Sequence, residues 1–329
     1  MKAIVCTALN GYQDLELKEV SPPQRGKGEA LIEVQNVALN FFDTLITKGK
    51  YQYKPDLPFS PGGEFSGIIR EIDENNDGLK PGDRVMAYPS WGALRQMITI
   101  SADKLIKLPD SISYEMAASL MITYGTAMHG LLDRAKLQPG ETVAVLGAGG
   151  GAGMAAVEIA VAAGAEVIAI ASSEDKLQLA KSRGAVGTIN SSNSDLKQTL
   201  KAYKASNGRI GVDVIYDCVG GDLAEPSLRA LNWGGRFLVV GFAGGEIPKI
   251  PLNLIMLKGL HVQGVFWGRF IEEQRQDYKD HMLQLLAWVE AGIITPHIDE
   301  VFPLEHTVKA LDKLAARKSM GKIVIDLKD

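Results

Sequence analysis

The chain has 329 residues, of which 46% are hydrophobic and 22% are charged, and its formal net charge is -4. A single hydrophobic core stops growing near about 250 to 300 residues, so this length predicts two compact units rather than one small binding module or a disordered chain. The slight negative charge offers no basic surface for a polyanion, and we therefore expect no nucleic-acid partner.

Cysteine is scarce, with only Cys6 and Cys218 in the chain. Two distant thiols cannot build a disulfide framework or a zinc site made of several thiolates, which favours a reducing, cytoplasmic compartment. No export signal is predicted at the N-terminus. The longest uncharged run, Thr142 to Val157, is shorter than the roughly 20 residues that a spanning helix needs, so we expect no membrane segment.

The N-terminal third reads as short alternating segments separated by stretches rich in proline and glycine. This pattern is typical of a β-rich unit. The expected strands are 2–7, 15–19, 30–38, 67–72, 84–87 and 96–100.

From residue 141 the chain alternates apolar β-rich segments with helical ones, which predicts a parallel sheet covered by helices. The expected strands are 142–147, 166–171, 212–217 and 236–241, with helices at 151–163 and 174–183.

After residue 260 the alternation stops. We expect a long amphipathic helix at 272–291, a strand at 298–302, a helix at 305–316 and a final strand at 322–326. This tail is too short for a third domain, so it is expected to return to the N-terminal unit. The predicted domains are therefore 1–117 completed by 264–329, and 118–263.

The most informative segment is a strand that runs into a glycine-rich turn and then opens a helix. Ala148, Gly150 and Gly153 have the spacing of a dinucleotide-binding turn, with alanine in place of the first glycine. The intervening Gly149, Gly151 and Ala152 belong to the same predicted site. Glycine lets backbone amides approach a pyrophosphate, and the helix N-terminus adds partial positive charge. The simpler alternative is an ordinary tight turn.

The end of the following strand selects the cofactor. An NAD site usually carries Asp or Glu there, whereas this chain has Ser172 and Ser173, with Lys176 one turn into the next helix. Hydroxyls and a cation would accommodate a 2′-phosphate, which favours NADPH. In the alternative interpretation, Ser173 only caps the helix and Lys176 belongs to a solvated face.

Several segments in order along the chain resemble the medium-chain dehydrogenase/reductase superfamily, and within it the zinc-independent quinone oxidoreductases. The resemblance covers essentially the whole chain and is carried by 40–43, 58–67, 80–85, 123–127, 148–153, 217–221, 234–236 and 321–324. It implies an α/β protein with a GroES-like β-rich catalytic domain, a Rossmann domain with a doubly wound parallel sheet, and an active site between them. It also implies a homo-oligomer, most simply a dimer, joined through the edge of the Rossmann sheet near 261–267. Burial of this apolar segment inside one chain is the alternative.

The resemblance also gives meaning to three absences. Zinc alcohol dehydrogenases of this superfamily have a cysteine ligand where this chain has Asn40, and a histidine ligand where it has Gly63. The four-cysteine structural zinc loop is missing as well, so no metal site is expected. Without a Lewis acid the enzyme must use acceptors that take hydride readily, and quinones and α,β-unsaturated carbonyls meet that demand.

Three residues are the catalytic candidates that the resemblance implies. Asn40 would donate from its amide to a substrate carbonyl, or else serve a local turn. Tyr51 matches a family tyrosine near the nicotinamide, and its phenol could donate a hydrogen bond; the alternative is a surface ring. Thr126 occupies the position that bonds the nicotinamide carboxamide, unless its hydroxyl bonds back to its own helix.

The remaining family positions line the cofactor or support the fold. Ser191 stands where related reductases often carry tyrosine against the 2′-phosphate. Glu64 is expected to make a structural bond at a turn or helix end, and Cys218 to be a packed residue rather than a redox thiol. Family analogy further implies cofactor contacts for Val219, Gly241, Phe242, Phe266 and Trp267, near the nicotinamide and the mouth of the cleft. Phe266 and Trp267 could stack on a flat substrate, although an aromatic pair is more often core.

We therefore expect an NADPH-dependent reductase of quinones or conjugated enals and enones. One alternative is a reductase of enoyl thioesters such as acrylyl-CoA, whose nucleotide tail would need cations, and Lys48, Lys50 and Lys54 could supply them. A second alternative is a nucleotide-binding protein with little turnover.

Overall fold

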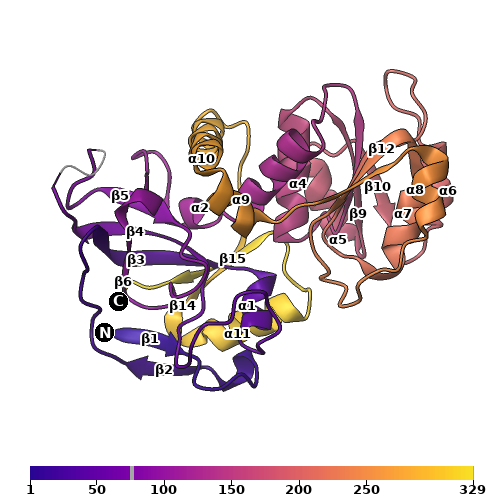
Figure 1. Cartoon of the computed structure of the whole chain (residues 1–329). Coiled ribbons are helices and arrows are strands. Elements are labelled where there is room, and N and C mark those ends of the chain that lie inside the picture. Colours follow the sequence, from indigo (N-terminus) through magenta and orange to yellow (C-terminus); the bar gives the residue numbers. More distant parts are fainter. Residues whose placement is uncertain (75–77, 329) are drawn as a thin grey trace. The chain divides into compact units, whose positions relative to one another are not determined.

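The computed structural model describes residues 1–74 and 78–328. The chain forms two compact units, and it crosses between them more than once (Figure 1). The first unit contains residues 1–122, 276–292 and 296–329, and the second contains 123–275 and 293–295. None of the helices described is long and apolar enough to cross a lipid bilayer.

The first unit is built on a mixed sheet whose strands are antiparallel except for the pair formed by β14 and β15. Its order is β14 (Ile298–Pro303), β15 (Lys322–Asp326), β3 (Glu29–Leu39), β4 (Glu64–Glu71), β5 (Arg84–Ala87) and β7 (Ile106–Lys107), and β6 (Met97–Ser101) pairs with β3. A separate hairpin joins β1 (Lys2–Val5) to β2 (Glu16–Glu19). The helices are α1 (Phe41–Ile46), α2 (Tyr114–Ala118), α10 (Arg275–Glu290) and α11 (Thr307–Ala315).

The register of this sheet positions polar residues at one end of β3. Leu39 of β3 lies opposite Ile323 of β15, while Ala38 lies opposite Glu64 of β4. The end of β3 therefore lies between the first residue of β4 and the first residue of β15. Lys322 opens β15, so it reaches the same end of the sheet as Asn40.

The second unit has a six-stranded parallel sheet with helices on both of its faces (Figure 1). The order is β10 (Gly187–Asn190), β9 (Glu166–Ala171), β8 (Thr142–Leu146), β11 (Val212–Asp217), β12 (Leu231–Val239) and β13 (His261–Gly264). Its helices are α3 (Thr123–Met128), α4 (Gly151–Ala162), α5 (Glu174–Ser182), α6 (Leu196–Ala202), α7 (Ala224–Ala230), α8 (Leu252–Lys258) and α9 (Trp267–Glu273), with a π-helical turn at His129–Arg134.

Right-handed crossovers explain this arrangement. The chain moves from β8 outward to β10 through α4 and α5, so these helices cover one face. It then reverses direction through α6, α7 and α8, which cover the other face. The reversal between β8 and β11 creates a switch point, where ligands bind beyond the carboxyl ends of the strands in open α/β sheets.

The predicted β-rich and strand–helix patterns are confirmed, but one predicted element is wrong. The helix expected at 272–291 is two helices, because Gln274 leaves the helical conformation between α9 and α10. The chain also returns to the first unit at 276 rather than at the predicted 264. The reason is that β13 completes the parallel sheet and Trp267 of α9 packs on Gly125 of α3. Some observed elements have no predicted counterpart, namely helices α1, α2, α3, α6, α7 and α8 and strands β7 and β10.

Candidate functional site

The glycine turn after β8 has the close packing that a dinucleotide site requires. Gly147 has a φ of 78°, and a Cβ on Gly153 would lie 2.1 Å from the carbonyl oxygen of Gly147. At Gly150, in contrast, the nearest atom to an added Cβ is that same oxygen at 3.7 Å. The backbone at Gly150 is therefore open to a ligand. The first turn of α4 follows directly, and the first N–H groups of a helix have no partner within it.

Two neighbouring loops close around this turn. Gly241 N–H donates to Asp217 O at 3.3 Å and Gly244 N–H donates to Val219 O at 2.7 Å, so the loops after β11 and β12 are bonded together. A Cβ on Gly147 would lie 2.8 Å from the Val219 side chain, which places this valine against the glycine turn. Phe242 lies against Gly220 in the same way. The structure thus places Val219 against the glycine turn. Gly241 and Phe242 lie on the neighbouring loop, which is bonded to the loop that carries Val219.

The residues predicted to select NADPH gather at the next strand end. Ser173 is the N-cap residue of α5, but its hydroxyl makes no capping hydrogen bond. Ser172 beside it is exposed. The aliphatic carbons of Lys176 lie 2.5–2.7 Å from where a Cβ on Gly149 would be, so this side chain lies along the turn. Ser191 N–H donates to Ala171 O at 2.9 Å, which fixes Ser191 beside the end of β9.

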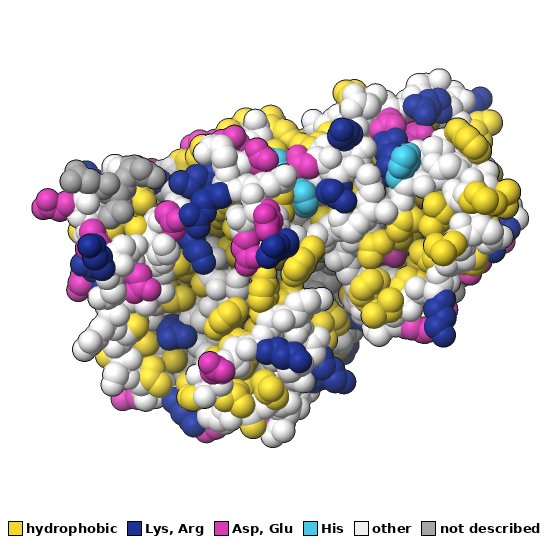
Figure 2. Space-filling view, in the orientation of Figure 1, with side chains coloured by type: hydrophobic (Ala, Val, Ile, Leu, Met, Phe, Trp, Pro, Cys, Tyr) yellow, Lys and Arg dark blue, Asp and Glu magenta, His cyan; other side chains and the backbone are white. Residues whose placement is uncertain are grey.

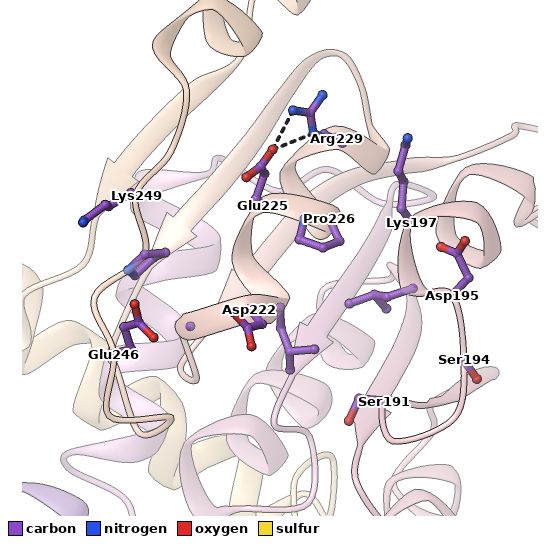
Figure 3. A pocket seen from close by; sticks show the side chains of 14 residues that line it. Ser191, Ser194, Asp195, Lys197, Asp222, Glu225, Pro226, Arg229, Glu246 and Lys249 are labelled. Atoms are coloured by element: carbon purple, nitrogen blue, oxygen red, sulfur yellow. Dashed lines mark hydrogen bonds and ion pairs between the residues drawn. The ribbon is translucent and has the colours of Figure 1, made fainter.

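A cavity of about 600 Å³ lies at this edge of the second unit. In Figure 3 its side chains come from the end of β10, the start of α6, helix α7 with the segment before it, and the loop after β12. Ser191 alone among the predicted cofactor residues lines it. Charges of both signs surround it, and the ion pair between Glu225 and Arg229 spans 2.5 Å. The cavity therefore shares only Ser191 with the predicted nucleotide site.

Cys218 is a packed residue, as predicted. Its thiol donates to Leu146 O at 3.0 Å. Burial, and secondarily the charge of Asp217, raises the pKa of the thiol to about 12. A thiol in this state is a poor nucleophile at neutral pH.

Thr126 lies on α3 next to a tight aromatic contact. Its hydroxyl makes no hydrogen bond to another described residue, so the alternative of a bond back to its own helix is not observed. A Cβ on Gly125 would lie 2.3–2.8 Å from ring carbons of Trp267, which is 5% exposed. Trp267 is therefore a packed core residue, as the alternative interpretation held. Phe266 is 44% exposed and remains a candidate for a ligand contact.

In the first unit, the amide of Asn40 is held by protein groups. It donates to Ala38 O at 3.2 Å and to Glu64 Oε1 at 2.8 Å, and its own Oδ1 accepts from Lys322 Nζ at 2.8 Å. Both amide hydrogens are thus occupied. Asn40 also precedes α1, where Asp43 Oδ2 accepts from its backbone N–H at 2.8 Å. The geometry corresponds to the local structural alternative rather than to the expected substrate donor.

Buried charge surrounds Asn40. Lys322 and Glu64 form an ion pair at 2.8 Å with side chains only 3% and 0% exposed. Glu64 Oε2 also accepts from Ile122 N–H at 2.8 Å, which confirms the structural bond predicted for this acid. Asp43 accepts from Gly62 N–H at 3.1 Å, and burial raises the pKa of its carboxyl to about 7. Lys322 and Asp43 lie within the family segments 321–324 and 40–43, but the sequence predicts no role for them, because a sequence motif does not show which side chains meet.

Unlike the amide of Asn40, the hydroxyl of Tyr51 is a hydrogen-bond donor that no described protein group occupies. Tyr51 is half-buried, and its ring stacks on Phe42 with 5.0 Å between ring centroids. Its hydroxyl makes no hydrogen bond to any other described residue. Burial, with smaller contributions from Tyr53 and Asp43, raises the pKa of the phenol to about 12. Tyr51 therefore stays neutral and retains a proton to donate.

The two positions that carry metal ligands in zinc relatives are filled by other groups. Asn40 is tied to Lys322, and a Cβ on Gly63 would lie 2.3 Å from Cζ of Phe42. A histidine side chain at position 63 would require this ring to shift. No cluster of three or more His, Cys, Asp or Glu side chains that could hold a metal occurs in the described parts of the chain.

The lysines of the thioester alternative lie at the surface. Lys48, Lys50 and Lys54 are all exposed. The ammonium of Lys48 lies over the ring of Tyr12, 5.6 Å from its centroid.

Both units match families of known proteins. Residues 26–110 match the alcohol dehydrogenase GroES-like domain, and residues 151–288 match the zinc-binding dehydrogenase family. Quinone oxidoreductase-like protein 2 of Rattus norvegicus is 39% identical over 328 residues, which cover 99% of this chain and 92% of that protein. Quinone oxidoreductase of the same species is 31% identical over 99% of this chain and 97% of its own length.

A solved structure agrees with these matches. The structure of Escherichia coli quinone oxidoreductase complexed with NADPH is similar over 99% of this chain and 100% of that one, with a TM-score of 0.91 and 28% identity. The chain therefore belongs to the quinone oxidoreductase family of the medium-chain dehydrogenase/reductase superfamily.

Proposed function

We propose that this protein is a zinc-independent, NADPH-dependent oxidoreductase that transfers hydride to quinones or α,β-unsaturated carbonyls. The observation that carries the proposal is the closed cluster of Asn40, Glu64 and Lys322, which fills one former metal-ligand position with hydrogen-bonded side chains. The neutral hydroxyl of Tyr51, in the same unit, could instead polarise an acceptor oxygen. Relatives solved with NADPH support the choice of nucleotide.

Each part of the chain has a defined task in this proposal. The amides after Gly150 bind the pyrophosphate, Ser172, Ser173 and Lys176 bind the 2′-phosphate, and Thr126 orients the nicotinamide carboxamide. NADPH, when bound, supplies the hydride. Tyr51 donates a hydrogen bond to the acceptor oxygen and so stabilises the negative charge that hydride addition creates there.

The proposal is tested by following NADPH and NADH oxidation on metal-stripped protein. A benzoquinone, a naphthoquinone, an enal and an enoyl-CoA are offered in parallel. We expect turnover with NADPH and a quinone or enal, unchanged by chelator. Turnover of the enoyl-CoA alone would favour the thioester alternative, and tight NADPH binding without any turnover would favour a nucleotide-binding protein. Activity that requires added zinc would contradict the proposal.

The Tyr51→Phe variant tests the proposed hydrogen-bond donor. It keeps the ring and its stacking on Phe42 but removes the hydroxyl. We expect kcat to fall about 100-fold, as is typical when one donor to a developing oxyanion is removed, with the Kd for NADPH unchanged. Steady-state kinetics and nucleotide titration measure both quantities. An unchanged kcat would exclude Tyr51 as the donor.

The Lys176→Met variant tests the preference for NADPH. Removing this cation should weaken NADPH binding by about 10- to 100-fold, since hydrogen bonds to charged groups contribute roughly 1.5–3 kcal/mol. NADH binding should hardly change, because NADH lacks the 2′-phosphate. Fluorescence titration with both nucleotides measures the two affinities, and Lys181→Met on the exposed end of α5 serves as the control. Equal weakening for both nucleotides would show that Lys176 does not recognise the 2′-phosphate.

The proposal includes a homodimer joined through the second unit. Strand β13 is the last strand of its sheet, so one side of it is open to pairing. Hydrophobic side chains gather on the surface of this unit near α8 (Figure 2). They include Trp233, Leu252, Met256, Leu257 and Val262, which are 38–78% exposed. An edge strand can pair antiparallel with its own copy about a two-fold axis, which would cover these side chains.

Light scattering during gel filtration tests the dimer. We expect twice the monomer mass for the wild-type chain and a monomer for Val262→Lys, because a charge would be buried at the paired strand. Leu283→Lys places the same charge on an exposed position of α10 and should leave the mass unchanged. A monomeric wild-type chain would contradict this part of the proposal.

The cytoplasm is the proposed compartment. Both cysteines are free thiols, which is consistent with a reducing environment.

A further inference from the structure

Four aromatic side chains of the first unit lie in a row. Phe42 and Tyr51 are stacked at 5.0 Å between centroids, Tyr51 and Tyr53 are tilted at 5.8 Å, and Tyr53 and Trp91 are tilted at 6.0 Å. All four are only partly buried. We call Phe42, Tyr51, Tyr53 and Trp91 the aromatic row. Of these residues only Tyr51 has a role in the proposed function.

The chain makes the row by specific backbone features in separate segments. Phe42 approaches closely because position 63 is glycine, where a Cβ would lie 2.3 Å from the phenylalanine ring. Trp91 lies between Ser90 at a φ of 74° and Gly92 at a φ of 104°. A serine with positive φ is an unfavourable conformation that surrounding structure must enforce, and such residues are concentrated at functional sites. The rings are thus held in position rather than left at random on a loop.

Packing leaves part of each ring uncovered. Tyr51, Tyr53 and Trp91 pack against the core of the first unit, but none of them is fully buried. Clustered aromatic surface of this kind is poorly accommodated by water and is well suited to a flat partner, because aromatic rings attract one another in offset or tilted arrangements 4.5–7 Å apart. The row also contains the neutral Tyr51 hydroxyl, so a ring lying on it would have a hydrogen-bond donor nearby.

We propose that the aromatic row binds the acceptor by stacking, so that Tyr53 and Trp91 determine specificity for flat cyclic acceptors over linear ones. This inference rests on the proposed function and adds the residues that select the acceptor. A naphthoquinone presents two fused rings to the row, whereas a linear enal presents no ring and gains little from it. The row begins at Phe42, two residues from Asn40, and includes the proposed donor Tyr51.

The test compares Tyr53→Leu and Trp91→Leu with a matched control. Tyr114→Leu makes the same chemical change at another partly buried aromatic residue of the first unit, outside the row. Kinetics are measured with 1,4-naphthoquinone and with trans-2-hexenal. We expect each row variant to raise the KM for the naphthoquinone about tenfold and the KM for hexenal less than twofold, while Tyr114→Leu changes neither. Equal changes for the two acceptors, or no change, would overturn the proposal.

A binding measurement separates this proposal from the proposed function. Calorimetric titration of 1,4-naphthoquinone into the protein saturated with NADP⁺ requires no hydride transfer. Weaker binding to the two row variants than to the wild type and Tyr114→Leu would support acceptor binding by the aromatic row, even if the enzyme oxidised no NADPH. A lack of NADPH oxidation would overturn only the proposed function. Equal binding by all four proteins would overturn the proposal that the aromatic row binds the acceptor, even if turnover were normal.

Discussion

A chain with Gly153→Ala is expected to lose NADPH affinity by more than about 100-fold. The added Cβ would lie 2.1 Å from the carbonyl oxygen of Gly147. The Cβ position is fixed by the backbone and the oxygen belongs to the backbone, so neither atom can turn away. Helix α4 must then move away from β8, which displaces the amides proposed to bind the pyrophosphate. Titration of the variant with NADPH, followed by nucleotide fluorescence, measures the loss.

Two further glycine variants test whether the loss of NADPH affinity is specific to the glycine turn. Gly150→Ala has room, since the nearest atom is 3.7 Å from its Cβ, so it should fold normally and yet weaken NADPH binding by obstructing the open approach. Gly26→Ala, in the first unit, meets only the flexible end of the Glu29 side chain and should change neither fold nor affinity. If Gly153→Ala bound NADPH as tightly as the wild type, the glycine turn would not be the nucleotide site.

Replacing Lys322 with methionine should reduce the free energy of unfolding by about 3–5 kcal/mol. This is the usual range when one partner of a buried ion pair is removed, because the remaining charge has lost its counter-ion without regaining water. Here the remaining charge is Glu64, whose side chain is 0% exposed. Asn40 and Leu39 O also lose the hydrogen bonds that Lys322 donates. Denaturant unfolding of the full chain measures the change.

Two controls separate buried charge from other effects of the substitution. Lys313→Met removes an ammonium that pairs with Asp299 and Glu300 but is 26% exposed, and it should cost about 1 kcal/mol or less. The double variant Lys322→Met with Glu64→Gln should recover much of the loss, since no unpaired charge is left buried. Equal losses for Lys322→Met and Lys313→Met would show that burial of the pair is not the cause.

The sequence by itself determined the parts of this protein that depend on local pattern. The alternation of apolar segments with helices predicted the parallel sheet, because strand and helix periodicities are read within a few residues. The glycine turn was predicted together with Ser172, Ser173 and Lys176, because the turn follows β8 and these residues follow β9, the next strand of one β–α–β unit. The structure places all of them at the carboxyl end of β8 and β9.

The tertiary structure decided what depends on residues far apart in the chain. Asn40 was predicted as a substrate donor, but its amide is bound by Glu64 and Lys322, and Lys322 is 282 residues away. The aromatic row likewise combines residues 42, 51, 53 and 91, which no local pattern relates. The single helix predicted at 272–291 became two, since packing of Trp267 on Gly125 keeps α9 in the second unit. A side chain can form a hydrogen bond or a ring contact with a residue far away in the sequence only after folding brings the two together. The distance between such partners is set by the fold and not by local sequence.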